Sequence, residues 1–317
     1  MKKLALSLVA TFLMSGSVMA AECIAPANPG GGWDFTCRQI GRILQEIGVE
    51  KDLVQVTNMA GAGGGVAFTH VVSERGKDEN LIVAASSATT TRLAQNAYAG
   101  MTADQVRWLG TIGGDPGVIV VAKDSPFKTI NDLIDAVKAD PGKVVFAGGS
   151  AVGGFDHLKV LMLLSRAGFN DARKVKYIGL DGGADAITQT VGGFAQAMTG
   201  DISEIQGFLR SGDVRALAVL SENRVAGFDD IPTAKEQGVD LVAMNWRGLY
   251  VPKGISDAAF DRWAEALKKV AESDQWKQVM ADNGLAPYTL IGAEFEAWVA
   301  ANIAEIQAIS KEIGIIQ

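Results

Sequence analysis

The sequence contains few cysteines and few histidines, which limits the chemistry it can perform. Only two of its 317 residues are cysteine and only two are histidine, His70 and His157. Each histidine lies in a predicted helix and precedes an apolar residue, so packing or capping is favoured over catalysis. Two cysteines without partner ligands cannot form a zinc site, and we predict no metal.

Two glycine-rich stretches resemble catalytic or nucleotide motifs but lack a required residue. The order Gly-Gly-Ser-Ala-Val at 148–152 lacks the second glycine of a G-x-S-x-G nucleophile elbow. The stretch 61–66 lacks the last glycine of a dinucleotide fingerprint, and no G-x-x-x-x-G-K-[ST] occurs. We therefore predict no cofactor and no enzyme. The remaining alternative is an exported α/β enzyme acting on a small organic acid, which would need Ser150 or His157 as a catalytic group.

Beyond the N-terminus the sequence has no run of about 20 apolar residues that could span a membrane. The first twenty residues combine Lys2 and Lys3, an apolar run at 4–14 and small residues at 18–20, which is typical of a secretory signal. We predict cleavage near Ala20 and a periplasmic location. The net charge of −7 argues against nucleic acid as a partner but leaves a small anionic ligand open, because local amides govern a buried cleft.

The two cysteines, Cys23 and Cys37, lie on either side of a glycine-rich turn. In an exported chain this spacing favours a disulfide over a reactive thiol or a metal ligand. A closed loop of about 15 residues contributes roughly 3 kcal/mol in the chain-entropy description. The bond would also fix the turn between the first strand and the first helix.

Three glycine-rich loops, at 26–34, 60–65 and 148–154, each follow a short apolar strand and precede a helix. Glycines let main-chain N–H groups approach a ligand closely, and a helix N-terminus adds unpaired N–H groups and a positive dipole end. This combination is a general anion site. The residues 86–91, Ser-Ser-Ala-Thr-Thr-Thr, follow a third strand in the same way.

The order of elements predicts an α/β protein with two blocks. Strands are expected at 23–25, 53–58, 81–85, 108–112, 117–121, 144–147, 175–178, 194–198, 214–220 and 246–251. Helices are expected at 34–47, 66–73, 130–139, 155–167, 184–191, 257–272 and 293–313, with another helix after the turn at 199–201. A later segment that returns to the first block implies two crossings and a hinged cleft. Ligands bind at the carboxyl ends of such strands.

Three residues near these loops allow two interpretations each. Trp33 either packs on the sheet or offers its indole N–H to a ligand oxygen. Asp34 is favoured as the helix N-cap over a ligand contact. Arg247 either clamps a carboxylate or forms a surface or interdomain ion pair, and the ion pair is favoured.

Several motifs in the right order resemble the periplasmic solute receptors of tripartite tricarboxylate transporters. They are Pro-Gly-Gly-Gly-Trp-Asp at 29–34, Asn-Met-Ala-Gly-Ala-Gly-Gly at 58–64, Gly153 with His157-Leu158, Ser-Gly-Asp-Val-Arg-Ala-Leu-Ala-Val at 211–219, Ile-Pro-Thr at 231–233 with Glu-Gln-Gly at 236–238, and Trp-Arg-Gly-Leu at 246–249. The resemblance covers essentially the whole mature chain. Three positions depart from the family pattern: Ala60, Gly154 and Leu180-Asp181. The acidic Asp181 leaves the number of ligand carboxylates open.

The resemblance implies a type II, Venus-flytrap binding protein with two doubly wound α/β domains. Domain 1 would comprise 21–121 and 246–317, and domain 2 would comprise 122–245. The resemblance further implies a ligand carboxylate held by main-chain amides of the first two loops and by ordered water. Its partners would be the one large and one small membrane subunit of the transporter, with the receptor itself a monomer.

The Trp33 loop looks like that of receptors for citrate and related tricarboxylates, with C4 or aromatic dicarboxylates as alternatives. The candidate ligand-binding residues are Pro29, Gly31, Gly32, Trp33, Asp34, Gly61, Gly63, Gly64, Ser86, Ser87, Ser150, Gly153, Gly154, Asp181, Gly182, Gly183 and Arg247.

Overall fold

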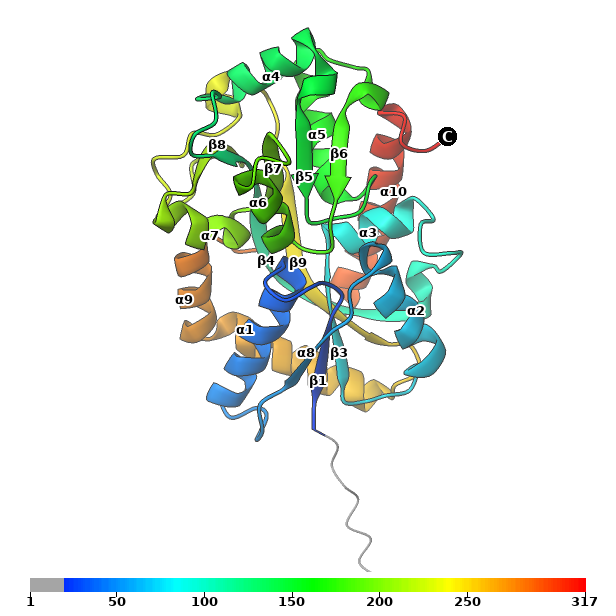
Figure 1. Ribbon diagram of the computed structural model, residues 1–317. Helices are drawn as coiled ribbons and strands as arrows, with labels where there is room; N and C mark the ends of the chain where they lie inside the picture. The colour runs from blue at the N-terminus through cyan, green and yellow to red at the C-terminus, as the bar shows by residue number, and fades with distance from the viewer. Residues whose placement is uncertain (1–19) are drawn as a thin grey trace, which may run out of the picture.

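The computed structural model describes residues 20–317 as an α/β molecule with two lobes (Figure 1). The predicted signal peptide, apart from Ala20, lies outside the described residues. The strands are β1 Glu22–Ala25, β2 Gln55–Asn58, β3 Leu81–Ser86, β4 Val106–Ala122, β5 Val145–Gly148, β6 Lys176–Gly179, β7 Ala197–Asp201, β8 Val214–Leu220, β9 Met244–Pro252 and β10 Leu290–Ile291. The helices are α1 Gly32–Glu46, α2 Gly65–Glu74, α3 Ser87–Ala94, α4 Ile130–Ala139, α5 Phe155–Arg166, α6 Gly183–Val191, α7 Ile202–Ser211, α8 Asp257–Glu272, α9 Asp274–Asn283 and α10 Ala293–Glu312.

The strands form a continuous path in the order β2-β1-β3-β9-β4-β7-β5-β6. In the first lobe β1 pairs in parallel with β2 and β3, and β9 runs antiparallel to β3. In the second lobe β5 pairs in parallel with β6 and β7, and β4 runs antiparallel to β7 and β8. This is the expected α/β architecture, with the loops after β1, β2 and β3 at one edge of the first parallel sheet.

Strand β4 belongs to both lobes, which differs from the prediction of two separate strands at 108–112 and 117–121. Its residues from Val106 to Pro116 pair with β9, and those from Gly117 to Ala122 pair with β7 and β8. The register with β9 shifts between Trp108 and Gly110 and again after Thr111. Such irregularities bend a strand without ending it, so the glycine-rich segment is a bend where a loop was expected.

Two further segments pass between the lobes. Strand β9 lies beside β4 through the middle of the molecule, and α10 starts near the first lobe and ends beside the second (Figure 1). On α10, Ile306 packs with Leu158 of α5 and Ala94 of α3. The predicted domain boundaries at 121/122 and 245/246 fall inside or beside these crossing strands and stay predictions.

Other elements differ from expectation at their ends. The residues 87–94 form helix α3 where a loop was expected, because Ser86 caps it by accepting the N–H of Ala88. Helix α9 was not predicted at all; it is capped by Ser273 directly after α8. Helix α1 begins at Gly32, two residues before the predicted start at Asp34.

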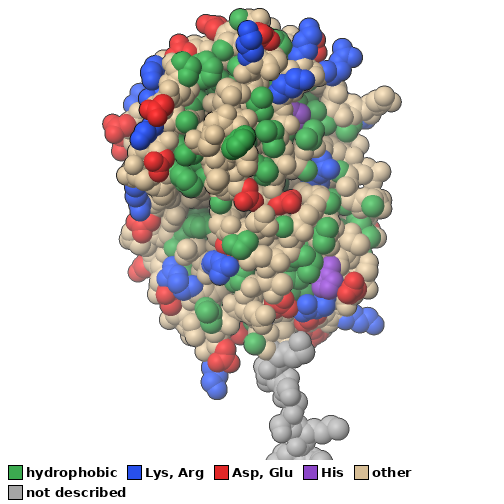
Figure 2. All heavy atoms as spheres, viewed as in Figure 1, with side chains coloured by type: hydrophobic (Ala, Val, Ile, Leu, Met, Phe, Trp, Pro, Cys, Tyr) green, Lys and Arg blue, Asp and Glu red, His purple; other side chains and the backbone are tan. Residues whose placement is uncertain are grey.

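The described helices include none that is both long and apolar enough to span a bilayer. On the face in Figure 2, acidic and basic side chains are interspersed over both lobes. That face shows no large region of one charge that would attract a polyanion.

Candidate functional site

A small cavity of about 30 Å³ lies between the lobes, where the loop before α1 meets the start of α6. Its volume is of the order of one water molecule's share of the liquid. Six predicted candidates line it: Gly32, Trp33, Ser86, Ser150, Gly182 and Arg247. The lining is completed by Ala27, Ala88, Gly149, Asp156, Asp201, Glu204 and Asn245.

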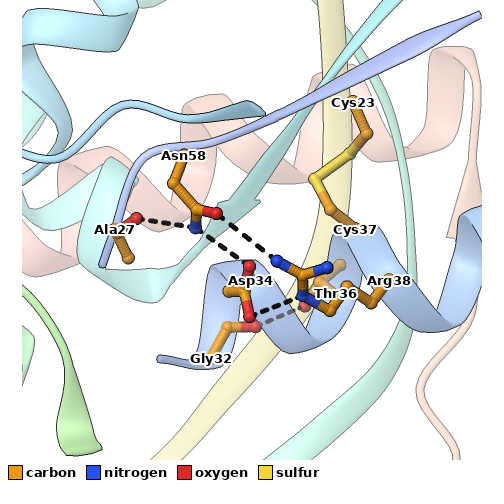
Figure 3. The surroundings of a disulfide bond; sticks show 8 residues. All are labelled: Cys23, Ala27, Gly32, Asp34, Thr36, Cys37, Arg38 and Asn58. Atoms are coloured by element: carbon orange, nitrogen blue, oxygen red, sulfur yellow. Dashed lines mark hydrogen bonds and ion pairs between the residues drawn. A yellow bond between two sulfur atoms is a disulfide. The ribbon is translucent and has the colours of Figure 1, made fainter. Parts of the chain in front are cut away.

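The first loop is held by Asp34, whose role differs from the prediction. Gly31, not Asp34, is the N-cap of α1. The Asp34 carboxylate accepts the Gly30 N–H at 3.0 Å. It also accepts hydrogen bonds from the side chains of Arg38 and Asn58 (Figure 3). Burial alone would raise the pKa of Asp34, but these hydrogen bonds and the Arg38 charge lower it. Asp34 therefore stabilises the conformation of the loop through these hydrogen bonds, and it does not line the cavity.

The predicted disulfide between Cys23 and Cys37 is present, with the two Cα atoms 5.6 Å apart (Figure 3). Both cysteines are fully buried. The bond ties β1 to the second turn of α1, on either side of the loop. It restricts how far the strand and the helix can separate when the loop moves.

Trp33 packs against the sheet, and its indole N–H already has a protein partner. The Nε1 atom donates to Ser86 Oγ at 3.0 Å. Only 8% of Trp33 is exposed, yet it lines the cavity. Ser87 follows Ser86 in the sequence but does not line the cavity; its N–H donates to the side chain of Asn245. The arrangement matches the packing interpretation of Trp33.

Arg247 forms a buried ion pair that joins strands of the two lobes, as in the interdomain alternative and unlike the surface pair considered for it. Its Nη2 lies 2.6 Å from Asp115 Oδ2 and 2.8 Å from Asp201 Oδ2, and Nε bonds Asp115 as well. Arg247 is only 2% exposed. Its Nη1 makes no hydrogen bond to any residue between 20 and 317, and a Cβ on Gly32 would collide with it. The free edge of the guanidinium thus faces the first loop.

A second cation, Lys159, lies deeper in the second lobe. Its Nζ is 2.8 Å from both Asp156 Oδ1 and Asp201 Oδ1, and the side chain is fully buried. Burial by itself would lower the pKa of Lys159, but the two carboxylates outweigh it and raise the pKa. The two cations and their three aspartates, Asp115, Asp156 and Asp201, form an alternating chain of charges.

Glu204 lies beside this chain of charges, and no cation from residues 20–317 is paired with it. Its Oε1 accepts the Gly32 N–H at 2.9 Å and Oε2 accepts the Asp201 N–H at 3.1 Å. The side chain is partly buried and lines the cavity. Burial of the carboxyl and repulsion by Asp201, Asp156 and Asp115 raise its pKa to about 8, although Arg247 acts in the opposite direction.

The second and third loops support the site without lining it at most of their predicted positions. Gly63 has a φ of 62°, and its carbonyl oxygen accepts a hydrogen bond from the Tyr98 hydroxyl at 2.7 Å. Gly64 packs near Trp33. The N–H of Gly153 donates to His157 Nδ1 at 3.0 Å. Candidates outside the cavity lining are Pro29, Gly31, Asp34, Gly61, Gly63, Gly64, Ser87, Gly153, Gly154, Asp181 and Gly183. Pro29 and Asp181 are exposed, whereas Gly183 packs directly under the Glu204 carboxyl.

Ser150 and His157 do not form a nucleophile and base pair. Ser150 Oγ accepts the Asp156 N–H and lies 3.4 Å from the Tyr177 hydroxyl. His157 accepts from Gly153 and stacks on Tyr177 with ring centroids 4.5 Å apart. Burial lowers the pKa of His157 to about 4. Both side chains order the third loop.

The charged residues of the site were missed by sequence reasoning: Asp115, Asp156, Lys159, Asp201 and Glu204. A usable signal existed for some of them. Lys159 stands among apolar residues of the predicted helix at 155–167, and Asp201 is the last residue of the stretch that forms strand β7. Charges in such places are rarely buried without partners, so they indicate a network.

The comparison with protein families matches residues 40–315 to the "Tripartite tricarboxylate transporter family receptor". Among curated proteins, Protein BugT of Bordetella pertussis is 27% identical over 297 residues, covering 92% of this chain and 89% of that protein. A UPF0065 protein of the same organism is 24% identical and covers 92% and 88%.

Solved structures with the same fold include the periplasmic binding protein BugD, with a TM-score of 0.82 and 23% identity over 94% of this chain and 98% of that one. R. palustris Rpa4515 with adipate has a TM-score of 0.84 at 20% identity, covering 93% and 97%. MatC from Rhodopseudomonas palustris with bound malate has a TM-score of 0.78 at 19% identity, covering 92% and 98%. These likenesses establish the two-domain fold of periplasmic binding proteins. Because the family match spans most of the chain, this protein belongs to the receptors of the tripartite tricarboxylate transporter family, which are extracytoplasmic solute-binding proteins and not enzymes.

Proposed function

We propose that this receptor captures a small carboxylate between its lobes and delivers it to the large and small membrane subunits of a tripartite tricarboxylate transporter. The loop before α1 would receive the carboxylate through its main-chain N–H groups. The protein would act as a periplasmic monomer after cleavage near Ala20.

One contact carries this proposal: the Gly32 N–H, at the N-terminus of α1, already donates a hydrogen bond to a carboxyl group, that of Glu204. The neighbouring Arg247 Nη1 faces the same loop and is held in place by Asp115 and Asp201. A main-chain N–H and a guanidinium edge that converge on one place suit a carboxylate, because both donate charge-assisted hydrogen bonds.

The cavity is too small for any of the expected acids, since ligand sites usually enclose about 300 Å³ or more. The lobes would therefore separate to admit the ligand and close again around it. This motion is the expected one for a hinged, two-domain binding protein. The lobes would correspond to residues 21–121 with 246–317 and to residues 122–245.

For the ligand itself we propose citrate or another tricarboxylate first, because the Trp33 loop resembles that of tricarboxylate receptors. C4 or aromatic dicarboxylates are the second candidates. Two solved proteins of the same fold contain adipate and malate, which supports a carboxylate in general. Four acidic side chains and two basic ones lie near the cavity, and this excess of acid disfavours each added negative charge on the ligand. It is the reason for keeping the dicarboxylates as second candidates.

A thermal-shift panel with citrate, malate, adipate and terephthalate tests the proposal, followed by calorimetric titration of the acids that stabilise the protein. A ligand at 100 times its Kd should stabilise the folded state by about 2.7 kcal/mol. The control is Gly32→Ala, whose Cβ would collide with Arg247 and disturb the proposed binding place. Absence of stabilisation by all di- and tricarboxylates would reject a carboxylate ligand.

A further inference from the structure

Glu204 reaches across the cleft and occupies the main-chain group that the proposed function gives to the ligand. It belongs to α7 of the second lobe, and its Oε1 lies 2.9 Å from the N–H of Gly32 in the first lobe. The loop before α1 thus already holds a carboxyl group supplied by the protein. A ligand carboxylate can bind the same N–H only after this contact breaks.

We propose that Glu204 is a built-in competitor for the ligand carboxylate, which sets the affinity of the cleft and excludes neutral analogues. This inference rests on the proposed function. A ligand that offers only an amide or hydroxyl oxygen gains little when it replaces the Glu204 oxygen on Gly32. A ligand carboxylate gains a charge-assisted hydrogen bond, about twice as strong as a neutral one, as long as Glu204 is uncharged.

The surroundings of Glu204 favour its uncharged form. The groups that face it are Asp201, Asp156, Asp115, Arg247 and Tyr177, and Lys159 lies behind the aspartates. Both cations are already paired with aspartates, and Glu204 has no cation within 4.0 Å among the described residues. Other charged groups nearby have their own partners: Asp34 bonds Gly30 and Arg38, Asp185 of α6 bonds Asn28, Arg210 bonds Gln206, and Asp282 of α9 bonds Gln278.

This arrangement makes carboxylate capture depend on pH. The pKa of Glu204 is raised to about 8, so below pH 8 the side chain is neutral and a ligand carboxylate displaces it without repulsion. Above pH 8 Glu204 is ionised, competes more strongly for the Gly32 N–H and repels the ligand. Because one proton is involved, the affinity should fall by about tenfold per pH unit above pH 8.

The first experiment needs no ligand. In protein with ¹³C-labelled glutamate carboxyls, Glu204 should titrate near pH 8, well above the usual range of a glutamate side chain. Hydrogen exchange should show the Gly32 amide protected in the wild type and less protected in Glu204→Ala. A midpoint near that of exposed glutamates, or unchanged protection of Gly32 in Glu204→Ala, would overturn the proposed contact.

The second experiment measures binding of citrate, malate and adipate, and of the neutral diamides malamide and adipamide, between pH 6.5 and 9.5. The Glu204→Gln variant stays neutral and keeps one side-chain oxygen, which can accept the Gly32 N–H, whereas its NH2 group cannot accept the Asp201 N–H. It should bind acids much as the wild type does at pH 7 but without the loss at high pH. Glu204→Ala should bind the acids more tightly than the wild type throughout. Glu305→Gln, an exposed matched control, should keep the wild-type pH profile.

Weaker binding in Glu204→Ala at every pH would show that Glu204 helps to hold the ligand and would overturn the competitor role. Equal wild-type affinity for malate and malamide would overturn the exclusion of neutral analogues. If none of the acids binds to any variant, the proposed ligand class fails together with the competitor role, whereas the ligand-free experiment still decides whether the contact exists.

Discussion

At the scale of single residues, Arg247 shows how this cleft is kept ordered. Its guanidinium bridges Asp115 and Asp201, which come from two different strands. Its planar guanidinium donates from both Nε and Nη2 to Asp115 while Nη2 also reaches Asp201, a fixed arrangement of donors that the rotatable ammonium of a lysine does not provide. The side chain that looked like a ligand clamp is thus first a structural cation, with only its Nη1 edge left for a ligand.

We predict that Arg247→Met lowers the free energy of unfolding by about 3 to 5 kcal/mol, because Asp115 and Asp201 would stay buried without their cation. Urea unfolding at pH 7 measures this change. The control is Arg42→Met, which removes an exposed pair with Glu46 and should cost about 1 kcal/mol or less. Equal stability of the two variants would show that the buried charges are compensated in another way.

The limits of prediction are also clearest at this scale. The glycine loops and the cysteine pair could be predicted because φ preferences, helix N-termini and the oxidising compartment act locally on neighbouring residues. The contact between Glu204 and Gly32 joins residues 172 positions apart, and the pair of Arg247 with Asp115 joins residues 132 apart. No local pattern specifies which distant carboxylate will face a given loop.

Among the strands and helices, too, features set by neighbouring residues could be predicted, whereas features set by contacts with distant segments could not. Alternating strands and helices with glycine turns predicted the two lobes, whereas β4 was divided in two because its glycines looked like a loop. The structure places Gly114 where a neighbouring side chain leaves no room, because a Cβ there would lie 2.7 Å from Met244 Sδ. In a strand shared by two lobes, close packing and a bend require glycine just as a turn does.

The disulfide acts at the junction of two elements, β1 and α1. We predict that replacing both Cys23 and Cys37 with alanine lowers the free energy of unfolding by about 3 kcal/mol, because the unfolded chain is no longer closed into a loop. Urea unfolding of the variant and of the reduced wild type should give similar losses. Thiol titration of the unfolded, unreduced wild type should find no free thiol, and two free thiols would contradict the bond.

At the scale of the whole molecule, opening of the cleft is opposed by a limited set of contacts between the lobes. The N–H of Asn28 donates to the Asp181 carbonyl at 2.9 Å, and its side chain donates to Asp185 at 2.8 Å. On the other side of the cleft, Gln95 donates to the Gly153 carbonyl at 2.7 Å. The contact of Gly32 with Glu204 lies between them. These hydrogen bonds must break together when the lobes part, while β4 and β9 keep the lobes connected.

We therefore predict that Asp185→Ala shifts the molecule towards open forms. Loss of one hydrogen bond at the exposed rim removes about 0.5 to 1.5 kcal/mol, which changes the ratio of open to closed molecules by roughly two- to tenfold. Small-angle X-ray scattering should show a larger radius of gyration than in the wild type. The control is Asp135→Ala on the exposed face of α4, which should leave the scattering unchanged. An unchanged radius of gyration in Asp185→Ala would mean that the buried contacts of Arg247 and Glu204 hold the lobes together without the exposed hydrogen bond between Asn28 and Asp185.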